Sequence, residues 1–384
     1  MAGEKVRVGV VGVGGMGSAH CYTCPKIEEV QLAAVADIDA ARAREIGEQF
    51  KVPFFSRHED LIASKLVDGV IVATPHYFHP PIAIDAFKAR LHVLSEKPIA
   101  VGVDMAEKMI KAAQKSGKVF AVMFQLRSSS VYQKARELVE SGALGEVRRT
   151  LLVSPEFRSQ AYYDSGGWRA TWAGEGGGVM MNQAPHIMDI FTLLGGLPSR
   201  VTGRIRTLMH RIEVEDDAVA LLEYPNGALG YFYVSTCEAG PGQLIEIVGD
   251  KGKLRIQDGE LSFYQYSPSV SEFNRTNTEM WGSPRREKVE LDIPKAGGGH
   301  QAIIRNWARA ILYGEKLLSP GAEGIRSLEL SNAITLSSFK NKPVTIPIRR
   351  RAFAKLLEQL KATSTFQKQV EGTKRETDPQ FKKG

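Results

Sequence analysis

Residues 5–17 read KVRVGVVGVGGMG, and this stretch decides the first part of the fold. The β-branched run from Lys5 to Val11 predicts a buried strand, and a glycine pattern and a helix-like segment through Ala19 follow it. The pattern G-x-G-x-x-G consists of Gly12, Val13, Gly14, Gly15, Met16 and Gly17. Such a turn between strand and helix lets the backbone approach a pyrophosphate at the helix N-terminus. The sequence therefore predicts a dinucleotide-binding unit.

Asp37 strengthens this prediction. It ends the next predicted strand, Leu32 to Ala36, twenty residues after Gly17. A carboxylate there accepts hydrogen bonds from the two adenosine ribose hydroxyls and repels a 2′-phosphate, so NAD is favoured over NADP. We count Ile38 with the same site. The alternative is that Asp37 only caps the helix that follows.

Alternating strands and helices continue after this unit. Further strands are expected at 69–73, 92–95 and 119–124, with helices at 81–89 and 104–116 between them. This alternation predicts a doubly wound parallel sheet, in which ligands bind beyond the carboxyl ends of the strands. The candidate residues at these ends are Thr74, Pro75, His76, His79, Glu96, Lys97 and Arg127. His79 is also explained as an ordinary loop or helix-start residue.

The order of the motifs resembles the Gfo/Idh/MocA oxidoreductases over about residues 5–347. The resemblance is carried by the glycine pattern, Thr74-Pro75 with His79, Glu96-Lys97-Pro98, Trp168-Arg169, and Gly176-Gly177-Gly178 leading to Asn182 and His186. It implies a Rossmann domain, expected at residues 1–126, and an α+β domain, expected at 127–348. It also implies substrate between the domains and a homo-oligomer, a dimer or tetramer, that packs through a large open sheet.

The sequence itself predicts that this second sheet is mostly antiparallel. Alternating strands separated by turn signals favour that arrangement. They are expected at 201–209, 218–224, 230–235, 244–248, 253–257, 261–266, 288–293 and 343–347, with helices at 300–313 and 323–339. Residues 349–384 carry a net charge of +6 out of the total of +7 and are expected to form a basic extension, a helix followed by a disordered tail.

The resemblance assigns catalytic roles to Lys97 and His186. A secondary alcohol releases hydride only as a base removes its hydroxyl proton, and imidazole or a buried lysine suits that task. Asn182 stands where the family has an acidic partner four residues before the histidine. We therefore expect Asn182 to orient the ring or bind substrate, with helix capping as the alternative.

Further side chains precede or follow the glycine run. Aromatic faces and a guanidinium suit the C–H faces and hydroxyl groups of a sugar, although aromatic residues also fill ordinary cores. The remaining candidates for substrate binding are Tyr163, Trp168, Arg169, Trp172, Arg127 and His300.

Composition excludes several other classes of protein. The charge excess lies in the C-terminal extension, so no nucleic-acid partner is expected. The sequence contains no stretch of 18 apolar residues, so no membrane span is expected. Cys21, Cys24 and Cys237 are too few for a disulfide framework, and Cys21 and Cys24 lack the second pair that zinc sites of this kind need. A cytoplasmic protein without a metal is expected.

The sequence thus predicts an NAD-dependent oxidoreductase that acts on a secondary hydroxyl or keto carbon of a sugar, polyol or glycoside. Two alternatives remain open. One is a glycosidase that oxidises its substrate transiently and recycles NAD, with Tyr163 and His300 as candidates for the second proton transfer. The other is a non-catalytic NAD-binding regulator, which the presence of both Lys97 and His186 disfavours.

Overall fold

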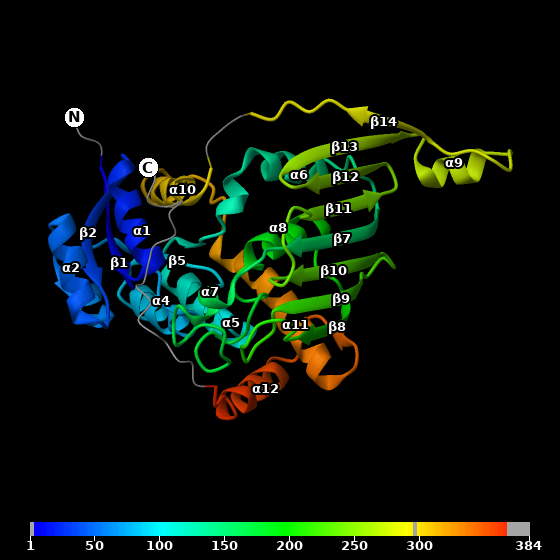
Figure 1. Ribbon diagram of the computed structural model, residues 1–384. Helices are drawn as coiled ribbons and strands as arrows, with labels where there is room; N and C mark the ends of the chain where they lie inside the picture. Colours follow the sequence, from blue (N-terminus) through cyan, green and yellow to red (C-terminus); the bar gives the residue numbers. More distant parts are fainter. Residues whose placement is uncertain (1–3, 295–297, 367–384) are drawn as a thin grey trace.

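The computed structural model describes residues 4–294 and 298–366, which form two β-sheets connected and covered by helices (Figure 1). The first sheet has six strands and the second has nine. The first is wholly parallel and the second is mostly antiparallel, so the predicted fold class is confirmed.

The parallel sheet has the strand order β3-β2-β1-β4-β5-β6. Its strands are β1 (Val6–Val11), β2 (Val30–Ala36), β3 (Phe54–Phe55), β4 (Gly69–Val72), β5 (His92–Ser95) and β6 (Phe120–Val122). Its helices are α1 (Gly15–Thr23), α2 (Ala40–Phe50), α3 (His58–Ala63), α4 (His79–Lys88) and α5 (Val103–Ser116). Every residue of β4 is buried, as expected for a strand covered on both faces.

The strand order reverses at β1, which lies between β2 and β4. In open parallel sheets, ligands bind at such a switch point, outside the carboxyl ends of the strands. Gly12, Asp37, Ala73 and Glu96 directly follow β1, β2, β4 and β5, so all four lie along this edge.

Helix α10 (His300–Tyr313) comes late in the chain but packs on the parallel sheet. Its Trp307 is fully buried in the apolar cluster that contains Val8 and Val10. A Cβ at Gly69 would lie 2.8 Å from Trp307 Cη2, so the glycine makes room for the indole. The predicted domain boundaries at residues 126 and 348 place this helix in the second domain. These boundaries stay predictions.

The second sheet has the order β14-β13-β12-β11-β7-β10-β9-β8-β15. Among its pairs, only β7 and β10 run parallel. Its strands are β7 (Val147–Pro155), β8 (Arg200–Arg206), β9 (Asp217–Glu223), β10 (Leu229–Ser235), β11 (Leu244–Gly249), β12 (Gly252–Gln257), β13 (Glu260–Ser267), β14 (Arg285–Val289) and β15 (Val344–Thr345).

Helices cover one face of this sheet (Figure 1). They are α6 (Ser130–Glu140), α8 (Pro185–Gly195) and α11 (Ile325–Lys340), while the short helices α7 (Gln160–Asp164) and α9 (Val270–Thr276) lie in connections. The sequence analysis missed α6 and β7. The two exposed arginines Arg148 and Arg149 interrupt the apolar pattern at the start of β7.

The predicted helix of the C-terminal extension is present as α12 (Arg350–Ala362). Phe353 and Leu357 are buried, and the helix packs against α5 and α11. The Arg350 guanidinium lies 2.9 Å from carboxylate oxygens of both Glu107 and Glu329, which ties α12 to both helices. The predicted disordered tail falls mainly on residues 367–384, outside the described residues.

Within residues 4–294 and 298–366, no helix combines the length and apolar character that a membrane span requires. The three cysteines are free. Cys21 and Cys24 are buried in the core, and burial raises the pKa of Cys24 to about 12. These two thiols therefore pack as small apolar side chains rather than as reactive groups.

Candidate functional site

The glycine turn has the shape that a pyrophosphate site needs. Gly12 has a φ of 86°, and a Cβ on Gly17 would lie 1.7 Å from the Gly12 carbonyl oxygen, so both positions require glycine. A Cβ on Gly14 or Gly15 would meet nothing within 4 Å. Helix α1 starts at Gly15, and the first N–H groups of a helix have no partner within it. The turn thus presents open backbone donors to an anion.

Asp37 is fixed beside this turn. Its Oδ2 accepts a hydrogen bond from Val13 N at 2.8 Å, and its Oδ1 accepts one from Asp39 N at 3.0 Å. Asp39, not Asp37, caps α2 by accepting from Ala41 N and Arg42 N. The capping alternative for Asp37 is therefore wrong. Ile38 is 95% exposed next to the carboxylate, so its apolar side chain faces solvent at the same edge.

The turns after β4 and β5 are tied together by His79. Its ring nitrogens lie 2.8 Å from the Pro98 carbonyl oxygen and 2.7 Å from that of Thr74, and the side chain is fully buried. His76 lies nearby, with Nδ1 3.1 Å from the Glu175 carbonyl oxygen. Burial lowers the pKa of His76, and the charges of His79 and Lys97 lower it further. These histidines hold the loops that flank Lys97.

Lys97 lies two residues after β5 and connects the parallel sheet to the loop that precedes α8. Its Nζ donates a hydrogen bond of 2.7 Å to the backbone carbonyl oxygen of Asn182, which is 85 residues away in the chain. Burial lowers the pKa of Lys97, while the negative charges of Glu96 and Glu175 oppose that effect. The ammonium is therefore easier to deprotonate than that of an exposed lysine.

Glu96 is anchored away from the lysine amine. Its Oε1 lies 2.7 Å from Nε2 of the buried His20 in α1, and its Oε2 accepts from the Lys97 backbone N–H. Burial alone would raise the pKa of Glu96, but the hydrogen bond and charge of His20 lower it overall. The His300 ring lies 5.7 Å from that of His20, and burial lowers the pKa of His300 to about 4.

His186 is the second residue of α8, after Pro185, where proline is tolerated because the first N–H groups have no intrahelical partner. Its Nε2 lies 3.2 Å from Gln125 Nε2. Burial lowers its pKa well below the ordinary value, and the charge of Lys97 adds to the shift. Its imidazole is therefore neutral at neutral pH, and Lys97 is close enough to influence it.

Asn182 contacts Lys97 through its backbone and other polar residues through its side chain. Its Nδ2 donates a hydrogen bond to Glu175 Oε1, and its Oδ1 accepts one from Tyr162 OH at 3.4 Å. The predicted helix-cap role is not seen, because Ala184 occupies the N-cap position of α8. Arg169 donates to Tyr162 OH at 2.6 Å and lies over the Tyr162 and Trp168 rings.

Several predicted residues are thus brought together around Lys97: Asn182, His186, Arg169, Trp168, His76 and, through His20 and Glu96, His300. Three others are engaged elsewhere. Arg127 forms a buried bidentate ion pair with Asp189 at 2.6 Å. Tyr163 OH lies 2.7 Å from Thr236 Oγ1, and the Trp172 ring packs 5.9 Å from that of Phe339.

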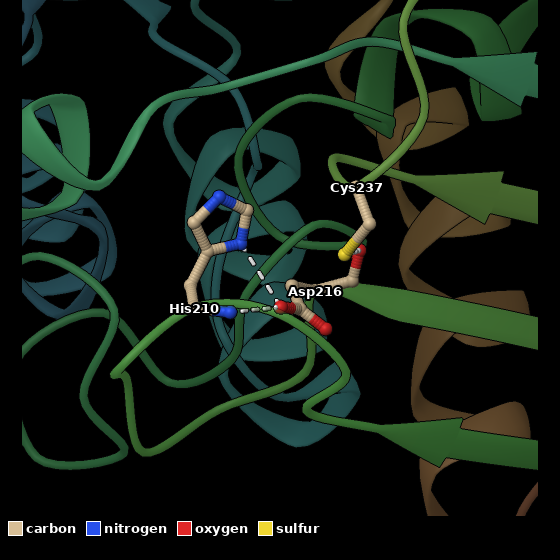
Figure 2. Close-up of side chains that lie close together, drawn as sticks. All are labelled: His210, Asp216 and Cys237. Carbon is tan, nitrogen blue, oxygen red and sulfur yellow. Dashed lines mark hydrogen bonds and ion pairs between the residues drawn. The ribbon is translucent and has the colours of Figure 1, made fainter.

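One group of possible metal ligands lies outside this cluster. Within the described part of the chain, His210, Asp216 and Cys237 offer ligand atoms that lie within 4.8 Å of one another (Figure 2). Both ring nitrogens of His210 already face oxygen atoms, Asp216 Oδ2 at 2.9 Å and the Arg158 carbonyl oxygen at 2.7 Å. Asp216 also accepts from three backbone N–H groups. The side chains of His210 and Asp216 are therefore occupied in holding loops together and do not form a vacant set of metal ligands.

Two family models match the chain. The oxidoreductase family model with the NAD-binding Rossmann fold matches residues 6–124, and the GFO/IDH/MocA C-terminal domain matches residues 132–255. The chain belongs to the Gfo/Idh/MocA oxidoreductase family. Both the predicted resemblance and the prediction of an NAD-binding domain are confirmed.

Similar proteins support the assignment to the Gfo/Idh/MocA family. Inositol 2-dehydrogenase of Corynebacterium glutamicum (strain ATCC 13032) is 36% identical, over 78% of this chain and 92% of its own length. The 2,7-anhydro-N-acetylneuraminate hydratase of Escherichia coli (strain K12) is 28% identical, over 65% of this chain and 67% of its own. The structure of the WlbA dehydrogenase from Chromobacterium violaceum with NADH and UDP-GlcNAcA has a TM-score of 0.79 and 28% identity, covering 91% of this chain and 98% of that one.

The residues of this Gfo/Idh/MocA protein fit a bound NAD. The open faces of Gly14 and Gly15 suit the pyrophosphate, and Asp37 suits the ribose hydroxyls. Within the described residues, the buried Thr74 Oγ1 and His186 Nδ1 have no hydrogen-bond partner. Buried polar atoms are normally satisfied, so these two atoms point to a ligand at this edge.

Two polar residues of this Gfo/Idh/MocA site were not predicted from the sequence: Tyr162 and Glu175. Tyr163 was predicted to bind substrate instead of its neighbour Tyr162, because only the register of α7 decides which ring faces Asn182. Glu175 directly precedes Gly176, which has a φ of 80° and would clash with Val101 if it carried a Cβ. That glycine run was the available signal, since it forces a tight turn beside Glu175.

We predict that Gly14→Ala weakens NAD binding by this Gfo/Idh/MocA protein about ten-fold or more, because its methyl group enters the space reserved for the pyrophosphate. Calorimetric titration with NAD measures the loss. The urea unfolding midpoint should not change, since the methyl group meets no protein atom. The matched variant Gly17→Ala should instead lower stability by about 1–3 kcal/mol or more through its clash. Wild-type NAD affinity in Gly14→Ala would contradict the assignment.

Proposed function

We propose that this protein is an NAD-dependent dehydrogenase that acts on a secondary hydroxyl group of a sugar or polyol. The observation that carries the proposal is the convergence of Lys97 and His186 at the ligand edge of the NAD-binding sheet. Burial keeps the His186 imidazole neutral and so leaves it free to accept a proton, while the ammonium of Lys97 can stabilise negative charge on the substrate oxygen. Nicotinamide, when bound, accepts or returns the hydride.

Two proton-transfer groups serve the same hydroxyl in this proposal. The neutral imidazole of His186 is available as a base, and its buried Nδ1 has no partner in the described part of the chain. Lys97 donates a hydrogen bond to the substrate oxygen and stabilises the negative charge that develops as the proton leaves. Its Nζ is held at 2.7 Å from the Asn182 carbonyl, so its position does not depend on the substrate.

The polar and aromatic residues around Lys97 favour a polyhydroxylated substrate. Trp168 supplies an aromatic face, which suits the C–H face of a sugar ring. Arg169 has its Nε buried without a partner among the described residues, so it retains a donor for a hydroxyl group. The relatives agree, since one is named as an inositol 2-dehydrogenase and another was solved with UDP-GlcNAcA.

A second candidate is a reaction without net oxidation, in which the hydride is returned to the substrate. The observation that favours it is the E. coli relative named as a hydratase, because hydration changes no overall oxidation state. A glycosidase with a recycled cofactor would share this property. A non-catalytic regulator has less support, since a partly buried lysine facing buried acids is costly to maintain for binding alone.

We expect purified protein with NAD to form NADH, measured at 340 nm without oxygen, on at least one member of a panel of inositols, aldoses, anhydrosugars and glycosides. Lys97→Ala should lower kcat by about 100-fold or more, because the developing negative charge on the substrate oxygen loses its stabilising hydrogen bond. His186→Asn should lower it by a similar factor. NAD affinity should stay near the wild-type value in both variants.

The control is Lys88→Ala, which removes an exposed lysine on α4 and should leave the rate unchanged. Substrate consumption without NADH would favour the recycled-cofactor reaction. NAD binding without consumption of any substrate would favour the regulator.

We also propose that the uncovered face of the second sheet forms a homo-oligomer. Leu221, Leu229 and Tyr231 are exposed on β9 and β10, and Tyr231 pairs directly with Leu221 across the strands. Adjacent apolar side chains on an open sheet face are typical of a protein interface. The free thiols are compatible with the cytoplasmic location that we propose.

Tyr231→Glu should therefore shift the protein from a dimer or tetramer to a monomer in analytical ultracentrifugation, because a charge is placed within the apolar interface. The exposed Trp281→Glu, far along the chain from these strands, serves as the control. A wild-type monomer, or an unchanged oligomer in Tyr231→Glu, would contradict the interface.

A further inference from the structure

Glu175 is a buried carboxylate that the catalytic scheme does not yet use. It is 1% exposed and lies between two neutral donors: its Oε2 accepts from Ala170 N at 2.5 Å, and its Oε1 accepts from Asn182 Nδ2. Because each oxygen accepts an N–H, the arrangement suits the ionised form. Burial raises the pKa of Glu175 overall, and Arg169, these two donors and Lys97 oppose the shift only in part.

Asn182 connects this carboxylate to the lysine. Its side chain binds Glu175, and its backbone carbonyl accepts the Lys97 ammonium at 2.7 Å. The other groups whose charge is coupled to that of Lys97 are Glu96, Glu156, Arg169 and the histidines His76, His79, His186 and His300. Glu96 is paired with His20 at 2.7 Å, and Glu156 forms an ion pair with Arg158. In the described part of the chain, Glu175 forms no ion pair within 4 Å, although the charges of Arg169 and Lys97 act on it.

We infer that Glu175 is a positioning residue that supplies, through Asn182, a negative charge facing Lys97 in addition to that of Glu96. An asparagine at position 182 carries no charge, and Glu175 places a carboxylate one hydrogen bond behind it. This charge opposes the effect of burial and keeps the lysine protonated until a substrate hydroxyl is bound. The negative charge of Glu175 acts on the pKa of Lys97, but it is not among the charges that act on the pKa of His186.

Each variant should shift the pKa of Lys97 in a defined direction. Glu175→Gln removes the negative charge, so the pKa of Lys97 should fall by about one unit, the lower end of the effect of a nearby charge. The double variant Glu175→Gln with Asn182→Asp moves the charge across the same hydrogen bond. The new amide can donate to Asp at 182 and still accept from Ala170 N, and Tyr162 OH can still donate to the new carboxylate. The pKa of Lys97 should return to the wild-type value or above it.

The test has two readouts, of which only the second rests on the proposed function. The first is the pH dependence of Lys97 carbamylation by cyanate, which reacts with the neutral amine, followed by mass spectrometry of the Lys97 peptide. The second is the pH profile of kcat/KM for NADH formation with whichever panel compound is turned over. In Glu175→Gln both midpoints should move about one pH unit lower, and in the double variant both should return.

Glu213→Gln is the matched control. Its carboxylate accepts a hydrogen bond from Trp172 N at 2.8 Å in the same loop, but it is not among the charges acting on Lys97. Its midpoints should equal those of wild type. A merely structural role for Glu175 would lower the melting temperature or the rate without moving either midpoint.

Unchanged midpoints in Glu175→Gln, or a shift that the double variant does not reverse, would overturn the inference. Should Glu175→Gln fail to fold, the double variant is compared with wild type, and a carbamylation midpoint below the wild-type value overturns it instead. A carbamylation shift in a protein that turns over no panel compound supports the role of Glu175 while counting against the proposed dehydrogenase. NADH formation without a shift supports the dehydrogenase and rejects the role of Glu175.

Discussion

The hydrogen bond from Lys97 Nζ to the Asn182 carbonyl oxygen is the constraint on which the site depends. It joins the ligand edge of the parallel sheet to the loop that enters α8 in the second part of the chain. A partly buried ammonium needs both hydrogen-bond acceptors and compensating negative charge, because desolvation of a charge is costly. The backbone carbonyl provides the first, and Glu96 and Glu175 provide the second.

The structure separates polar groups that hold the scaffold from those that remain available for chemistry. Arg127 is held by Asp189 and Glu323 and joins three segments of the chain, so removing one partner should cost about 3–5 kcal/mol. His210 and Asp216 brace two loops in a comparable way. His186 and Thr74 instead retain buried atoms without partners in the described residues. The scaffold residues thus hold in place a few polar groups without hydrogen-bond partners, which lie at one edge of the parallel sheet.

Much of this arrangement could be predicted from the sequence, and the reasons for the exceptions are physical. The glycine turn, Asp37 and Lys97 follow strands, and the topology of a parallel sheet brings strand ends together whatever the details of packing. Arg127 also follows a strand, but its burial beside Asp189 depends on how α8 packs. The choice between Tyr162 and Tyr163 depends on the register of one short helix. Local sequence does not encode either relationship.

We propose that hydride moves directly from a substrate carbon to nicotinamide beside Lys97 and His186. It is tested most directly with a panel substrate that is turned over and carries deuterium on the reacting carbinol carbon, followed by mass spectrometry of the released NADH. Direct hydride transfer predicts one deuterium atom in each NADH formed. Released NADH without deuterium, or deuterium found only in the carbohydrate product, would contradict it.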